Sequence, residues 1–276
     1  MKKQPIKYIL PSLLLFSLII LFVSCSDEEG KSSLGENLTY ELVKYHKISP
    51  SCDSIKNENC AEIKIEFPKV TFPVNKSVEE KINKSITTLF SQDILGSTES
   101  SDFEVLMNGF IQDYKAFISE FPDAFQFWFI ERTGEVKLNK GNIFSLDFME
   151  YSYTGGAHPN TFVIFKNYNL FDGEEITLDE IISPEKQAEL TKLGEAEFRK
   201  LKDLTTEADL GQTGFWFENN EFYLNDNFLI TDSSLVFYYN NYEITAYAFG
   251  PTELTIPFSK IEPLIGEKSL LKGLIK

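Results

Sequence analysis

The 276-residue sequence carries 42 acidic and 26 basic side chains, which gives a formal net charge of −16. Binding to nucleic acid needs clustered positive charge, so this balance argues against a nucleic-acid partner. The 25 Phe, 12 Tyr and 2 Trp residues supply enough large apolar side chains for a sizeable core, which argues against a disordered protein.

The N-terminal segment has the layout of a secretory signal. Basic residues precede an apolar run from Tyr8 to Val23, and the small residue Ser24 stands directly before Cys25. The run is shorter than the roughly 20 residues that a spanning helix prefers, which favours a cleaved signal over a transmembrane anchor. We therefore expect residues 1–24 to be a lipoprotein signal peptide and Cys25 to carry the lipid.

Residues 25–37 are expected to form a tether. The acidic stretch Ser26–Glu29 resembles the export signal of surface lipoproteins in Bacteroidetes-type bacteria, although a solvated linker explains it as well. Removing residues 1–25 takes away three lysines and no acid, so the mature charge is 23 − 42 = −19. Anionic headgroups would repel such a surface. We therefore expect the lipid, and not the protein surface, to hold the protein at the membrane. The expected localisation is the outer membrane, with the folded part in the periplasm or at the cell surface.

Apart from Cys25, the chain has two cysteines, Cys52 and Cys60. In an oxidising compartment we expect them to form a disulfide, which on the chain-entropy model stabilises by about 2–3 kcal/mol. Free thiols or a metal site are the alternatives. A metal would need two further ligands, and no other Cys or His lies close by in the sequence.

Hydrophobic periodicity predicts the elements of the first half. Alternation predicts strands at 40–47 and 61–67, and capping boxes at Ser77–Glu80 and Ser101–Glu104 predict two helices, the second ending before Pro122. From residue 124 a period of two predicts an antiparallel meander through 148, with turns at Thr133–Gly134 and at 140–142.

The second half alternates in the same way between strands and helices. Strands are expected at 161–168, 222–224, 228–231, 235–239 and 244–249, and helices at 184–202 and 258–264. The class is therefore α+β, with antiparallel sheets packed against a few helices. We expect an N-terminal domain over 38–144, a C-terminal domain over 145–265 and a tail at 266–276.

Common catalytic signatures are absent from the sequence. The only histidines are His46 and His158, which excludes a His-rich zinc site, and no nucleophile elbow, phosphate-binding loop or Cys-x-x-Cys pair occurs. No catalytic residue, metal or cofactor is therefore assigned. An enzyme that uses two carboxylates on envelope glycans stays an alternative, because that chemistry needs only two acids about 5–9 Å apart.

The most unusual local segment lies between two expected strands. Gly155 and Gly156 permit positive backbone angles, and Pro159 keeps His158 out of the helical region, so the loop would present an imidazole and the amide of Asn160. A structural turn with its polar groups tied to backbone is the alternative. We take Gly155, Gly156, His158 and Asn160 as candidate binding residues.

Longer motifs carry a family resemblance. Gly155–Thr161 followed by Asn169–Asp179, together with Leu235–Gly250 and Thr255–Phe258, resembles the C-terminal domain of the RsiV anti-sigma factor family over residues 145–265. Ile65–Pro68 before a helix that contains Asn83 is similar to the preceding domain in RsiV and in the deacetylase PdaC. The resemblance implies an extracytoplasmic α+β module.

The resemblance transfers only part of the family's activities. Anti-sigma activity would need a cytoplasmic segment, and only seven residues precede the apolar run, so we do not expect it here. PdaC acts through a separate polysaccharide deacetylase domain, which we do not find in this sequence. The remaining implication is binding, because the RsiV ectodomain recognises lysozyme, a cationic protein that an acidic surface would suit.

These observations predict a non-enzymatic binding module whose partner is a lysozyme-like protein or a cell-wall glycan such as peptidoglycan. A structural or assembly lipoprotein is a third possibility. A glycan binder should expose aromatic rings, for which Trp128, Trp216, Tyr242 and Tyr247 are candidates, although any of them could instead belong to the core. Tyr242 and Tyr247 join the loop as candidate binding residues.

Overall fold

The computed structural model describes residues 38–50, 52, 60–71, 75–92, 100–124 and 127–275. The expected signal peptide 1–24, the lipidation site Cys25 and the tether 25–37 lie outside the described residues. Within the described part of the chain, no helix combines the length and the apolarity needed to cross a membrane.

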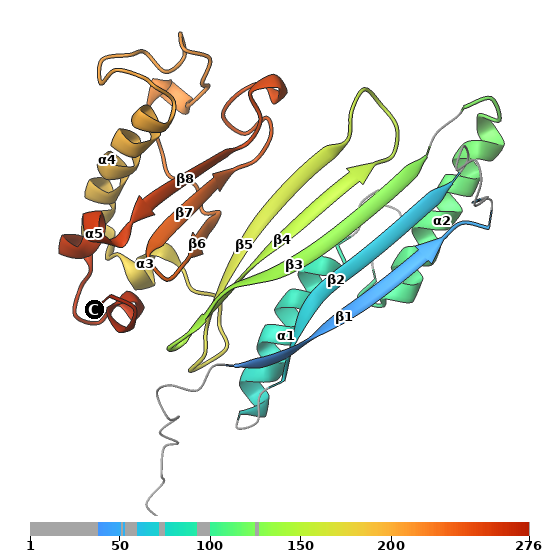
Figure 1. Cartoon of the computed structure of the whole chain (residues 1–276), viewed down its shortest axis with the longest axis horizontal. Coiled ribbons are helices and arrows are strands. Elements are labelled where there is room, and N and C mark those ends of the chain that lie inside the picture. The colour runs from blue at the N-terminus through green and yellow to red at the C-terminus, as the bar shows by residue number, and fades with distance from the viewer. Residues whose placement is uncertain are drawn as a thin grey trace, which may run out of the picture. The chain divides into compact units, whose positions relative to one another are not determined.

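The first half forms a five-stranded sheet in the order β1-β2-β3-β4-β5 (Figure 1). Its strands are β1 (Thr39–Ile48), β2 (Ala61–Thr71), β3 (Trp128–Lys140), β4 (Ile143–Tyr153) and β5 (Asn160–Asn169). β2 and β3 pair in parallel and all other neighbours are antiparallel. A parallel pair needs a crossover connection, and two helices supply it here.

Those helices are α1 (Lys76–Phe90) and α2 (Phe103–Glu120), and both pack on the same buried cluster of the sheet. The predicted α1 positions Val78, Ile82, Ile86 and Leu89 are all buried. The predicted capping boxes were wrong, because the N-cap of α1 lies two residues before Ser77 and the N-cap of α2 lies one residue after Ser101. Asn75 caps α1 by accepting from two backbone N–H groups, and Asp102 caps α2 by accepting from Glu104 N.

The expected turn at Thr133–Gly134 was also wrong, because β3 runs straight through it. Gly134 has a packing role instead: a Cβ atom there would lie 2.7 Å from Cζ of Phe90. The buried face of β3 carries Trp128 and Ile130, whereas Phe129 on the other face is half-buried. The glycine therefore admits an aromatic ring from α1.

The second half forms a smaller antiparallel sheet, β6 (Phe228–Ile230), β7 (Ser234–Tyr239) and β8 (Thr252–Pro257) (Figure 1). Three helices, α3 (Leu178–Ile181), α4 (Pro184–Leu201) and α5 (Phe258–Ile261), and the 3-10 turns Glu218–Asn220, Tyr247–Phe249, Glu262–Leu264 and Leu270–Gly273 complete it. Its core is apolar and includes Leu138 and Ile143 from the β3–β4 hairpin. The α+β class with antiparallel-rich sheets is thus confirmed.

Four points in this half need correction. Residues 222–224 are not a strand, and 244–249 form a turn and a 3-10 helix because the chain reverses at Tyr242, whose φ is 66°. The strand β8 was missed, although its buried Thr252, Leu254 and Ile256 alternate with exposed residues. Residues 266–275, expected as a tail, place Leu271 and Leu274 in the second core.

The two sheets meet along β5. Val163 and Phe165 on β5 pack against Leu229 and Val236 of the smaller sheet. The expected domain boundary at residue 144 falls inside β4, so β4 and β5 complete the first sheet and the second sheet begins after them.

Candidate functional site

The loop between β4 and β5 is shaped by its two glycines. Gly155 and Gly156 have φ of 111° and 105°, angles that side-chain-bearing residues rarely adopt. Tyr153 at the end of β4 donates from its hydroxyl to the carbonyl oxygen of Gly156 over 2.9 Å. This bond holds the loop against its own strand, and Asn160 lies exposed where β5 begins.

His158 on this loop contacts a segment almost 90 residues away. Its ring stacks on the ring of Tyr247, with centroids 3.7 Å apart and an interplanar angle of 16°. Tyr247 also donates from its hydroxyl to the carbonyl oxygen of Pro159 over 3.0 Å. The ring of Tyr242 lies 5.5 Å from that of Tyr247. The structure therefore brings together the loop and the two tyrosines that sequence reasoning had singled out.

The contacts of His158 define its neutral tautomer. Nδ1 lies 2.8 Å from the carbonyl oxygen of Pro159, which can only accept, so Nδ1 carries the proton. Nε2 is then an acceptor, 3.5 Å from the hydroxyl of Tyr242. In the neutral ring, the imidazole thus directs one acceptor at the hydroxyl of Tyr242.

Other exposed aromatic side chains lie on the same or neighbouring segments of backbone. Tyr242 is 57% exposed, Phe249 69% and Trp216 52%. Trp216 is tied to the same segment because its backbone N–H donates to the carbonyl oxygen of Ile244 over 3.0 Å. We call His158, Trp216, Tyr242, Tyr247 and Phe249 the aromatic surface.

Trp128 does not belong to the aromatic surface. It is buried in the first core, where its ring lies 5.5 Å from that of Tyr114. Of the four aromatic candidates from the sequence, Trp128 is therefore a core residue, Tyr242 and Tyr247 lie together, and Trp216 is exposed on the neighbouring segment.

Sequence reasoning missed a second group of rings on the sheet face opposite α1 and α2. The ring of Phe129 lies 5.7 Å from that of Phe127, 5.0 Å from that of Tyr151 and 6.3 Å from that of Tyr153. We call these four residues the aromatic row. Tyr153 links the row to the β4–β5 loop through its bond to Gly156. The sequence does show these aromatic residues at alternate positions along β3 and β4, but aromatic residues that alternate in this way were taken for core positions.

One acidic side chain beside β5, Glu243, is engaged in structural contacts. A cavity of about 350 Å³ beside β5 is lined by Asp226 and Glu243. Glu243 accepts from Asn225 Nδ2 over 2.6 Å and from Asn240 N over 2.8 Å, so both its oxygens hold the chain reversal. Among the described residues, no group of three or more His, Cys, Asp or Glu side chains is arranged to hold a metal ion.

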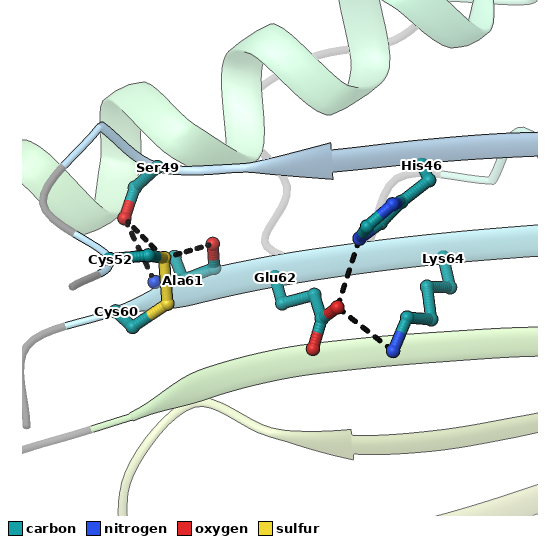
Figure 2. The surroundings of a disulfide bond; sticks show 7 residues. All are labelled: His46, Ser49, Cys52, Cys60, Ala61, Glu62 and Lys64. Carbon is teal, nitrogen blue, oxygen red and sulfur yellow. Dashed lines mark hydrogen bonds and ion pairs between the residues drawn. A yellow bond between two sulfur atoms is a disulfide. The ribbon is translucent and has the colours of Figure 1, made fainter. Parts of the chain in front are cut away.

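The expected disulfide is present between Cys52 and Cys60, in the connection from β1 to β2 (Figure 2). Beside it, the buried hydroxyl oxygen of Ser49 accepts from the backbone N–H of Ala61 over 3.1 Å. Figure 2 also shows Glu62 between His46 and Lys64. Burial raises the pKa of Glu62, but the hydrogen bonds from Lys64 and His46 outweigh it and leave that pKa below its usual range.

Two family profiles match the chain in consecutive segments. Residues 54–161 match the family described as "Deacetylase PdaC", and residues 179–259 match the family described as "Protein of unknown function (DUF3298)". The β4–β5 loop falls in the first match, whereas Tyr242 and Tyr247 fall in the second. The aromatic surface is therefore assembled from both segments.

Solved structures show the same fold. A DUF3298 family member from Bacteroides fragilis superposes with a TM-score of 0.70 at 20% identity, covering 87% of this chain and 99% of that one. A DUF3298 family protein from Pseudomonas aeruginosa PAO1 gives a TM-score of 0.60 at 18% identity, covering 86% and 98%.

One curated relative has a named activity. An esterase from Mycobacterium tuberculosis is 34% identical over 112 residues, which is 40% of this chain and 47% of the esterase. The chain thus matches about half the length of that relative. The order of the family matches and the shared fold show that the chain is built as a PdaC-like segment followed by a DUF3298-like segment, the architecture that its motifs had indicated.

Proposed function

We propose that the protein is a non-enzymatic binding module of the bacterial cell envelope, and that its aromatic surface contacts a cell-wall glycan. The observation that carries the proposal is the stacking of His158 on Tyr247, which joins the two family segments in one exposed cluster of rings. Exposed rings without a covering layer are unusual for a purely structural contact and are a common feature of recognition sites.

The chemistry of the surface favours a sugar over a charged partner. Its five side chains are aromatic, and the two ring nitrogens of His158 lie beside the carbonyl oxygen of Pro159 and the hydroxyl of Tyr242. Sugar rings have apolar faces that stack on aromatic side chains, and their hydroxyls match the tyrosine hydroxyls and the imidazole nitrogen. A cationic protein such as a lysozyme would instead draw on the net charge of −16, which is a property of the whole chain.

The lipid anchor on Cys25 belongs to the same proposal. It would hold the binding surface at the outer membrane, in reach of peptidoglycan or of the cell exterior. Metabolic labelling with an alkyne fatty acid tests it in the native host. We expect the full-length protein to be labelled and a Cys25→Ala variant to lose the label. A labelled Cys25→Ala protein would contradict the anchor but leave the glycan proposal standing.

Binding is tested with the chain Ser33–Lys276, which forms one compact unit containing both cores. We expect it to sediment with insoluble peptidoglycan and to bind N-acetylglucosamine oligosaccharides saturably in calorimetry. Tyr242→Ala and Trp216→Ala should each weaken binding by about tenfold, the effect of losing one stacked ring. Phe171→Ala is the matched control, because Phe171 is also an exposed ring but lies on the turn after β5.

The outcomes separate the partners. Saturable binding to lysozyme without binding to either glycan would replace the sugar by a protein partner. Binding to none of the three would remove the proposal, as would glycan binding that Phe171→Ala weakens as much as Tyr242→Ala.

Ester hydrolysis is a second candidate function, favoured by the esterase relative. It is tested by p-nitrophenyl acetate turnover and by mass spectrometry of muropeptides after incubation. The alternative of a carboxylate-based enzyme that acts on envelope glycans is the weaker one, since Glu243 is held on both oxygens by its neighbours. Unchanged muropeptides together with no turnover above the uncatalysed rate would rule out both.

A further inference from the structure

A second pocket lies away from the aromatic surface, between α1 and the C-terminal half of β5. Its volume is about 490 Å³, enough for a monosaccharide-sized molecule. Three lysines line it, Lys81 and Lys84 from α1 and Lys166 from β5, and the hydroxyl groups of Ser85 and Tyr168 are part of the lining. Such a gathering of cations is unexpected in a chain with 42 acidic residues.

Two of the three lysines are neutralised by the turn that follows β5. Lys81 Nζ lies 2.5 Å from Glu174 Oε1, and Lys166 Nζ lies 2.5 Å from Glu175 Oε1. Lys84 is exposed and makes no ion pair with any described residue. The five charged side chains of the lining therefore sum to one positive charge, which Lys84 supplies.

The hydroxyl pair offers a hydrogen-bond donor at a fixed position. Ser85 Oγ lies 2.9 Å from the hydroxyl oxygen of Tyr168. The two groups have two hydrogens, and only one is used between them, so the other can be donated to a ligand. Burial raises the pKa of the Tyr168 phenol above the normal tyrosine range, which keeps the phenol protonated and makes it a poor base.

The wall of the pocket is held against α1. At Gly173, whose φ is 76°, an added Cβ would lie 3.1 Å from the Cα of Val78, so the turn touches the backbone of the helix. Lys81 Nζ also donates to the carbonyl oxygen of Asp172 over 3.0 Å. The pocket is thus formed before any ligand arrives, which lowers the cost of binding.

We propose that this pocket binds the oxyanion of a small polar ligand, a carboxylate or a phosphate monoester on a sugar-sized body, with Lys84 as the counter-charge and the Ser85–Tyr168 pair as the donor. Lys84 is the one lysine of the lining with a free charge, and a hydroxyl donor beside it completes two contacts to one anionic group. The site shares no residue with the aromatic surface and does not depend on it.

The test uses four probes with the Ser33–Lys276 chain in low-salt calorimetry: inorganic phosphate, N-acetylglucosamine 1-phosphate, N-acetylmuramic acid and uncharged N-acetylglucosamine. We expect at least one charged sugar to bind, and the uncharged sugar to bind about tenfold more weakly or not at all. Binding of N-acetylmuramic acid alone identifies a carboxylate ligand, and binding of the two phosphates alone identifies a phosphate ligand.

Variants locate the site. Lys84→Gln should lower the affinity for the charged probe by about tenfold or more, and Ser85→Ala should lower it by a smaller factor. Lys115→Gln, at an exposed position on α2, makes the same charge change elsewhere and should leave the affinity unchanged. Thermal melting of each variant shows that it is folded.

Three results would overturn the proposal: no charged probe binds, the uncharged sugar binds equally well, or Lys84→Gln and Lys115→Gln weaken binding equally. Tyr242→Ala is expected to leave oxyanion binding unchanged. Failure here is therefore distinguishable from failure of the aromatic surface to bind glycan.

Discussion

The five-stranded layer, β1–β5 with α1 and α2, and the three-stranded layer, β6–β8 with α3–α5, contain different kinds of buried polar group. The first contains a charge: Arg132 on β3 is 2% exposed and lies 2.9 Å from Glu150 on β4. It also donates to the carbonyl oxygen of Phe90 at the end of α1. The second has an apolar core, and amide side chains occupy its border with the first.

Those amide side chains form the hydrogen bonds to the β5 backbone that a neighbouring strand would otherwise form. Asn240 accepts from Val163 N over 2.8 Å and donates to Val163 O over 2.9 Å, as a paired residue would. Asn227 accepts from Phe165 N and donates to Val163 O, and Asn167 on β5 accepts from Ile230 N. Arg132 therefore links α1 to the sheet on which it packs, whereas the asparagine side chains link one sheet to the other. Side-chain joints of this kind can be broken by single substitutions.

The largest effect is expected at the buried charge. Arg132→Met leaves Glu150 and the carbonyl oxygen of Phe90 without this partner and should lower the free energy of unfolding by about 3–5 kcal/mol. Urea unfolding of the Ser33–Lys276 chain measures it. The double variant Arg132→Met with Glu150→Leu should recover part of the loss, because it removes the stranded carboxylate. A loss below about 1 kcal/mol in the single variant would mean that the charge is not needed.

The amide joint comes next. Asn227→Ala leaves Phe165 N, Val163 O and Tyr238 O without this side chain, and we expect a loss of about 2–3 kcal/mol. Asn227→Asp keeps the acceptor for Phe165 N but cannot donate, so it should also destabilise. Asn108→Ala, at an exposed position on α2, is the control and should change stability little. An equal response of Asn108→Ala and Asn227→Ala would refute the idea of a side-chain joint.

The disulfide strengthens only the five-stranded layer. Replacing Cys52 and Cys60 together by Ser opens a link between residues eight apart and should cost about 2–3 kcal/mol on the chain-entropy model. Thermal unfolding with and without reductant measures it: reduced wild type and the double variant should melt at the same temperature. If reduction left the wild-type melting temperature unchanged, the link would have no role in stability.

Among the buried phenols are Tyr168 in the first layer and Tyr239 in the second. Burial raises both pKa values above the ordinary value of 10.0. The unfolded chain then loses these protons first, so this contribution is complete below about pH 10 and decreases as pH rises above it, by up to about 1.4 kcal/mol per pH unit for each group. Tyr239→Phe and Tyr168→Phe should each flatten the alkaline slope, whereas Tyr40→Phe at an exposed position should not. Unchanged slopes in both variants would contradict the sign of the shifts.

Much of the five-stranded layer was predictable because its segments are regular. Val78, Ile82 and Ile86 recur at helical spacing, and local periodicity alone places them in the core. Gly134 was wrongly predicted to form a turn, because glycine is common in turns. A glycine is needed here because a side chain would clash with the ring of Phe90, which is more than 40 residues away in the sequence. The hydrogen bonds from Asn227 and Asn240 to β5 could not be predicted either, because their partners are distant in sequence and both residues look like ordinary loop residues.

The candidate site was predictable in its parts and not in its assembly. Gly155, Gly156 and Pro159 mark a shaped loop by local chemistry, and the segment with Tyr242 and Tyr247 was marked by family resemblance. No periodic signal connects His158 with Tyr247, because the two lie on different family segments and meet only through the packing of both sheets at β5.

The smallest change in stability should accompany a large change in binding. Tyr242 has a φ of 66°, a conformation that costs an L-residue roughly 1 kcal/mol and that glycine adopts freely. Tyr242→Gly should therefore leave stability unchanged or raise it by up to about 1 kcal/mol, while glycan affinity falls by about tenfold because a stacking ring is lost. Urea unfolding and calorimetry on the same sample measure the two effects. The proposed glycan contact would explain why an exposed ring is kept in a strained backbone, so a variant that binds as before would remove Tyr242 from the site.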